Sequence, residues 1–145
     1  MRIGYKPQRG RATIVETGDR KPLLEAMQEL VGGYIEFFDP LWGDEPALVV
    51  NDNGVHDPYC TANLLIRATE RMREVGFLST LDFSHIVEVG EPYMLLFGDV
   101  LAVSYDEDGD ARDITDEEFA RFEGMCADCD VSDLSRSQIV DLLLE

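Results

Sequence analysis

The chain has 145 residues, 45% of them hydrophobic and 29% charged, a composition that indicates one folded domain rather than a disordered or fibrous protein. Thirty acidic against twelve basic side chains give a net charge of −18, which opposes direct binding to nucleic acid and favours a basic partner. No apolar run approaches the roughly 18 residues of a membrane span, and the N-terminus lacks the apolar segment of a secretory signal, so we expect a cytoplasmic protein without a membrane partner.

The first elements predicted are two short strands followed by a helix. Residues 2–6 and 12–16 have strand-like composition and are separated by the turn-forming "PQRG". In "KPLLEAMQELVGG" the apolar residues change to helical spacing, with Pro22 in the first turn and Gly32-Gly33 as the stop. The chain therefore begins with a strand pair and a short amphipathic helix.

The middle of the chain alternates between strand and helix patterns. "YIEFFDPLW" and "PALVVND" are predicted as strands, and Asn53-Gly54 is typical of a two-residue hairpin turn whose central positions need a positive φ. From Thr61 to Val75 the apolar residues follow helical spacing, and Gly76 is suited to end that helix. "PYMLLFGDVLAVSY" is apolar nearly throughout, which favours a central strand or a tight hairpin covered on both faces.

The tail "SDLSRSQIVDLLLE" predicts a terminal helix. Ser135 and Gln138 have the spacing of a capping box, and the apolar residues after them make a helix of about ten residues that is too short to be stable alone. The helix either closes the core of its own domain or docks on a second copy, which leaves a homodimer open.

Together these elements predict an α+β fold with a mainly antiparallel sheet packed with two to four helices. Residues 1–145 form a single compact domain in this interpretation. Residues 1–20 supply basic N-terminal strands, and residues 124–145 are a C-terminal extension that carries the terminal helix.

Three segments carry a resemblance to a known family: "MQELVGGYIEFF", then "LVVNDNG" followed by Asn63 and Ala68, and "GDVLAVSYDEDGDARDITDEEFARF". They resemble the small phage- and plasmid-borne domain of unknown function 3846 over residues 20–123 or so. The resemblance implies an accessory protein of a mobile element with an α+β fold. It implies no reaction, cofactor or catalytic residue, and the N-terminal arm and the tail after Gly124 lie outside it.

The stretch "YDEDGDARDITDEEF" has two interpretations. Asp106, Asp108 and Asp110 followed by Glu117 match part of a calcium loop, but Ala111 stands where that loop needs glycine for its sharp turn. The favoured interpretation is a polar turn after a strand, followed by a capping box of Thr115 and Glu118 that starts a helix.

The charge is strongly segregated along the chain. Residues 1–24 carry +4 and residues 25–145 carry −22, and the segment 106–133 contains twelve acidic and two basic side chains. Such a surface repels itself unless a positively charged partner neutralises it, so we expect these carboxylates to bind the basic surface of another protein. The candidate partner-binding residues are Asp106, Glu107, Asp108, Asp110, Asp113, Asp116, Glu117, Glu118, Glu123, Asp128, Asp130 and Asp133.

A second set of residues offers an alternative of a different class. His56, Cys60, Cys126 and Cys129 supply zinc ligand types, and Cys126 and Cys129 have the spacing of half a zinc site. The alternative is a small zinc-binding regulatory protein, although our first interpretation includes no metal or other cofactor. A dimeric structural module is the third possibility.

No catalytic motif of a hydrolase, metalloprotease or nucleotide-binding enzyme occurs in the sequence, so we expect a non-enzyme. Acidity and compact size, together with the family resemblance, lead to one expected function. The protein would inhibit a host defence complex of the restriction or CRISPR type by occupying its basic nucleic-acid site as a nucleic-acid mimic.

Overall fold

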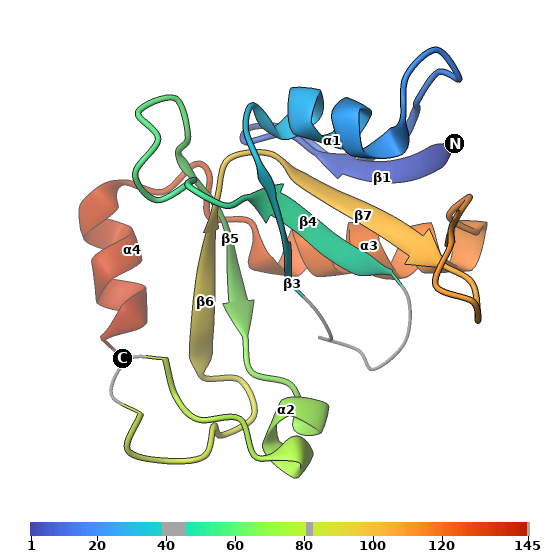
Figure 1. Cartoon of the computed structure of the whole chain (residues 1–145). Coiled ribbons are helices and arrows are strands. Elements are labelled where there is room, and N and C mark those ends of the chain that lie inside the picture. The colour runs from blue at the N-terminus through green and yellow to red at the C-terminus, as the bar shows by residue number, and fades with distance from the viewer. Residues whose placement is uncertain (39–45, 81–82, 145) are drawn as a thin grey trace.

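The computed structural model describes residues 1–38, 46–80 and 83–144 (Figure 1). Two antiparallel sheets and four helices make up this part of the chain, which confirms the predicted α+β class. The strands of the main sheet run in the order β2-β1-β7-β4-β3, and β8 pairs with the end of β7. A small sheet contains β5 and β6.

The strands and helices have the following bounds. The main sheet consists of β1 (Arg2–Lys6), β2 (Thr13–Glu16), β3 (Ile35–Phe38), β4 (Ala47–Asn51), β7 (Val100–Tyr105) and β8 (Ala111–Arg112); the small sheet of β5 (Ala62–Arg67) and β6 (Pro92–Phe97); and the helices are α1 (Leu23–Val31), α2 (Glu70–Val75), α3 (Asp116–Cys129) and α4 (Arg136–Leu143).

The main sheet is covered on both faces, with α1 and α3 on opposite sides (Figure 1). On one face Met27 and Val31 of α1 pack on Val49 of β4 and Leu101 of β7. On the other face the side chains of α3 and of the small sheet share one core with β4 and β7. Because β7 lies between two covered faces, its residues Val100 to Ser104 are all buried, as expected for a central strand.

Helix α3 lies directly against the backbone of β1. Phe122 is fully buried, and a Cβ atom added at Gly4 would lie only 2.9 Å from its ring. A glycine is therefore required at position 4 for the helix to approach the strand this closely.

A buried lysine joins the main sheet, the small sheet and the end of α3. Lys6 of β1 is 1% exposed, and its Nζ donates to Asn63 Oδ1 of β5 at 2.7 Å and to the Pro7 carbonyl at 3.0 Å. The carboxylate of Asp130, directly after α3, lies 3.3 Å from the same ammonium. Asn63 also donates to the Gly98 carbonyl at 2.8 Å, so the connection between β6 and β7 is held at this junction as well.

The terminal helix packs on the outer face of the small sheet. A separate buried cluster contains Leu65 of β5, Ile139 of α4 and Val131, which lies between α3 and α4. Leu142 and Leu143 of α4 add partly buried contacts to it. The predicted capping box is present, since Ser135 Oγ accepts from Gln138 N and Gln138 Oε1 accepts from Ser135 N. In the described part of the chain no helix has both the length and the apolar character needed to cross a bilayer.

The helix predicted from Thr61 to Val75 is wrong in its first half. Residues Ala62–Arg67 form strand β5, and only Glu70–Val75 are helical, ending at Gly76 in a left-handed conformation. Leu64 and Ile66 face the main core while Leu65 faces α4, so both faces of the strand are buried. A strand buried on both faces shows an unbroken apolar run, which has no period to distinguish it from a helix.

The hairpin predicted at Asn53-Gly54 is also wrong, and of the two alternatives for "PYMLLFGDVLAVSY" the central strand holds for β7 and the hairpin does not. Asn53-Gly54 does not join paired strands, because β4 pairs with β3 and β7 while β5 pairs with β6, and neither residue has a positive φ. "PYMLLFGDVLAVSY" forms β6 and β7, but these strands belong to different sheets. The strand predicted for "YIEFFDPLW" is confirmed as β3 up to Phe38, and its remaining residues lie outside the described part.

Replacing Asn63 tests the junction. We expect Asn63→Leu to lower the free energy of unfolding by about 3 kcal/mol, because Lys6 and the Gly98 carbonyl would each lose a hydrogen-bond partner in a buried site. Urea unfolding measures this loss, with Asn53→Leu in an exposed turn as the matched control. Equal stability of the two variants would show that the junction contributes nothing.

Candidate functional site

The acidic stretch begins in the turn between β7 and β8. The Asp106 carboxylate accepts the backbone N–H groups of Asp108 and Asp110, each at 2.9 Å, and Asp106 N donates to the Asp110 carbonyl at 2.8 Å. These side chains and Glu107 are exposed. The segment is therefore a self-capped turn with its carboxylates directed to solvent.

The calcium interpretation of this stretch is wrong. One oxygen of Asp106 is already occupied by two backbone donors. Among the described residues, no group of three or more His, Cys, Asp or Glu side chains is placed to hold a metal ion.

The capping box predicted at the start of α3 is confirmed. Thr115 Oγ1 accepts from Glu118 N at 3.1 Å, and Glu118 Oε1 accepts from Thr115 N at 2.9 Å. Arg112 of β8 adds a bidentate contact, with its two terminal nitrogens 2.8 and 2.9 Å from the Glu118 carboxylate. Burial alone would raise the pKa of Glu118, but the hydrogen bonds from Arg112 and Thr115 outweigh it and lower the pKa to about 2.

Two basic residues of the N-terminal strands bind carboxylates of the protein itself. Arg2 donates from its backbone N to Asp113 Oδ1 at 2.8 Å and from its guanidinium to Asp116 at 3.1 Å, and Lys6 is buried against Asp130. Burial would raise the pKa of Asp130, but hydrogen bonds from Ser132 and Lys6 lower it. These two basic groups therefore neutralise carboxylates of the protein itself, and neither is left for a partner.

The twelve candidate carboxylates fall into two groups. Glu118 is 5% exposed and held by Arg112, Asp130 is held by the buried Lys6, and Asp116 is exposed but paired with Arg2, so each of these three has an ion pair within the chain. The others are exposed, and we call them the acidic surface: Asp106, Glu107, Asp108, Asp110, Asp113, Glu117, Glu123, Asp128 and Asp133.

Three carboxylates of the acidic surface lie on the solvent-exposed part of α3. Phe122 and Cys126 are buried against the sheet, whereas Glu117, Glu123 and Asp128 are exposed. With 14 residues, α3 is about 21 Å long. The β7–β8 turn lies at the N-terminal end of the helix (Figure 1), so the carboxylates extend from that turn along the helix to Asp133.

The structure does not bring the four possible zinc ligands together. Cys126 is 2% exposed and packs in the main core, Cys129 packs against it, Cys60 lies beside Gly98, and His56 is exposed in a turn. Burial raises the pKa of Cys126 to about 12 and also raises the pKa of Cys129 and Cys60, which disfavours the thiolate needed for metal binding or redox chemistry.

The most buried side chain of α4 packs against other residues of the same chain. Ile139 is buried against β5, whereas Val140 and Leu144 are 44% and 77% exposed. The domain-closing role that we expected of the helix is present, and a homodimer through the same helix stays a prediction.

Sequence reasoning missed the roles of Lys6, Asn63 and Arg112. Lys6 belongs to the basic N-terminal strands predicted from the sequence, and its position two residues after Gly4 on β1 places it on the core face of the strand. Asn63 stands in an apolar run, which is a signal for a satisfied buried polar group. Nothing comparable in the sequence indicates the role of Arg112, because the β7–β8 turn determines that this residue lies beside Glu118.

The low pKa of Glu118 predicts a pH dependence of stability. Because the folded-state pKa lies below the ordinary value of 4.5, the stabilisation is fully present above pH 4.5 and is lost as the pH falls toward 2. We expect Glu118→Gln to be less stable than the parent at pH 7 by roughly 3 kcal/mol, with the difference shrinking below pH 4.5. Urea unfolding between pH 7 and pH 2 measures it, with the exposed Glu117→Gln as control. A difference that does not change with pH would contradict the assignment.

Comparisons with known proteins give a family without a described activity. Neither the curated proteins nor the solved structures contain a match. The model of the domain of unknown function DUF3846 matches residues 1–127. The match extends further than expected at the N-terminus, since it includes β1 and β2, and it ends within α3, so that α4 lies outside it. The chain therefore belongs to the DUF3846 family.

Proposed function

We propose that the protein is a non-enzymatic inhibitor that occupies the basic nucleic-acid site of a host defence complex of the restriction or CRISPR type, in the cytoplasm of a cell that carries a phage or other mobile element. The observation that supports this proposal is the acidic surface, which combines the β7–β8 turn with the outer side of α3. Its partner would be the positively charged channel that normally holds nucleic-acid phosphates.

The distribution of ion pairs favours a partner over simple solubility. Arg2, Lys6 and Arg112 each neutralise one carboxylate of the segment 106–133, and the carboxylates paired with Lys6 and Arg112 help to hold the fold. The carboxylates of the acidic surface repel one another in the isolated protein, and a basic channel would remove that repulsion. Solubility alone needs neither this concentration of charge nor a helix to carry it.

Rigidity supports mimicry of a nucleic acid. The capping box, the Arg112–Glu118 contact and the buried Phe122 fix α3 on the sheet, and Asp106 holds its own turn. Carboxylates on a fixed scaffold lose little conformational entropy on binding, whereas a disordered acidic tail would lose much more. The surface therefore presents its charges in a constant arrangement, as a duplex does.

Two variants with the same net charge test the proposal. The surface variant neutralises six carboxylates of the acidic surface: Glu107→Gln, Asp108→Asn, Asp110→Asn, Glu117→Gln, Glu123→Gln and Asp128→Asn. The control variant neutralises six exposed carboxylates on other elements: Glu25→Gln, Glu36→Gln, Asp52→Asn, Glu70→Gln, Glu74→Gln and Asp141→Asn.

We expect the parent and the control variant to inhibit DNA cleavage by a sensitive restriction or CRISPR complex, with excess DNA relieving the inhibition. The surface variant should need at least a tenfold higher concentration for the same effect, while its melting temperature stays at or above that of the parent because repulsion is reduced. Equal inhibition by the two variants would contradict recognition through the acidic surface. Inhibition by the parent that excess DNA does not relieve would contradict mimicry.

A further inference from the structure

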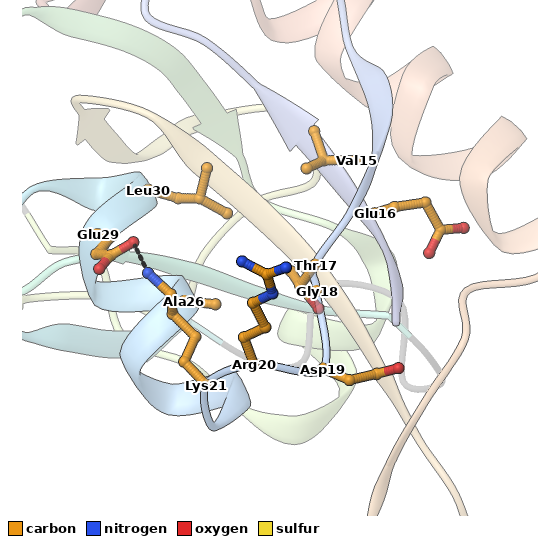
Figure 2. Close-up of a pocket in the computed structure, with 10 residues that line it drawn as sticks. All are labelled: Val15, Glu16, Thr17, Gly18, Asp19, Arg20, Lys21, Ala26, Glu29 and Leu30. Carbon is orange, nitrogen blue, oxygen red and sulfur yellow. Dashed lines mark hydrogen bonds and ion pairs between the residues drawn. The ribbon is translucent and has the colours of Figure 1, made fainter.

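A cavity lies between α1 and the outer strand β2. Helix α1 packs mainly over β3, β4 and β7, so it leaves the edge of the sheet at β2 partly open on that face. The segment from Thr17 to Lys21 leads from β2 into α1 and borders this space (Figure 2). The resulting cavity has a volume of about 790 Å³, which is within the range of sites for small molecules.

One wall of the cavity is apolar. Val15 of β2 and Leu30 of α1 are partly buried side chains that pack against the core cluster of this face, and Ala26 is buried beside them. No aromatic side chain is among the described residues that line the cavity, so the wall suits an aliphatic group better than a planar base.

Among the described residues that line the cavity, Arg20 supplies the charge that is directed into it without an ion-pair partner. Figure 2 shows its guanidinium between α1 and the β2 segment, whereas the Asp19 carboxylate points away from it. Lys21 is paired with Glu29, which raises the pKa of Lys21, and Glu16 lies 3.6 Å from the N-terminal ammonium. Within the described ranges, no carboxylate lies at ion-pair distance from Arg20.

The neighbouring carboxylates decide which anion suits this site. A guanidinium binds carboxylate and phosphate groups equally well in geometric terms, through two parallel hydrogen bonds. Asp19 also lines the cavity, however, and its carboxylate, unlike those of Glu16 and Glu29, is not paired with a cation of the described residues, so it repels a dianion about twice as strongly as a monoanion. The single charge of a carboxylate is therefore better matched to the site than the nearly double charge of a phosphate monoester.

From this geometry we infer that the cavity binds a small organic carboxylate with an aliphatic body. The carboxylate accepts hydrogen bonds from Arg20, and the aliphatic body covers Val15, Ala26 and Leu30. This site is separate from the acidic surface and does not depend on the function proposed for that surface.

Three probes with the same aliphatic chain and different head groups test the inference: octanoate, octyl phosphate and 1-octanol. Amide chemical shifts of the full-length protein are followed in titrations to about 10 mM, a range suited to a weak ligand of this size. Octanoate should give saturable shifts at Thr17, Arg20 and Leu30 and should bind more tightly than the other two probes. A missing response at these residues, or tighter binding of 1-octanol or octyl phosphate, would overturn the inference.

Substitutions identify the group that recognises the carboxylate. Arg20→Gln should weaken octanoate binding at least tenfold and leave the weaker 1-octanol binding unchanged, whereas Arg9→Gln, which removes an exposed arginine outside the cavity, should change neither. Melting temperatures of both variants establish that they are folded. An Arg20→Gln protein that is folded and binds octanoate like the parent would show that Arg20 does not hold the carboxylate.

Discussion

The burial of one ammonium group determines how the parts of this protein fit together. Removal of a lysine side chain from water costs several kcal/mol unless hydrogen bonds and an opposite charge replace the solvent. Lys6 obtains these from Asn63 at 2.7 Å and from Asp130 at 3.3 Å. Because the three residues belong to β1, β5 and the end of α3, the two sheets and the helix are held in one arrangement. The Asn63 contact to the Gly98 carbonyl extends the junction to the connection between β6 and β7.

This arrangement also sorts the charges of the protein. Arg2, Lys6 and Arg112 all bind carboxylates of the most acidic segment, residues 106–133. Part of the negative charge of that segment is therefore neutralised within the protein. The carboxylates that remain are those that the geometry turns outward. Helix α3 buries Phe122 and Cys126 on one side and exposes Glu117, Glu123 and Asp128 on the other, as an amphipathic helix on a sheet must. The same contacts that stabilise the fold therefore define the surface that we propose to be functional.

The features predictable from the sequence are those that depend on local rules. The capping boxes at Thr115 and Ser135 involve residues three positions apart, and both are present with the expected hydrogen bonds. The β5 segment is predicted as a helix because Leu64 to Ile66 are apolar at successive positions and show no period of two. They pack against α3 on one face and α4 on the other, and both contacts are distant in sequence. The burial of Lys6 depends on partners that are 57 residues away at Asn63 and further away at Asp130. Long-range pairing decides burial in both cases, and a single sequence does not contain it.

The central claim is that charge on the acidic surface directs binding to the partner, and its most direct test is the salt dependence of affinity for a defence complex that the protein inhibits. Raising the salt concentration from about 0.05 to 0.5 M shortens the Debye length from roughly 14 to 4 Å. We predict that the dissociation constant rises steeply over this range, and that the rise is much smaller for a protein in which the acidic surface is neutralised. An affinity that stays constant across the range would contradict the account and would indicate an apolar interface instead.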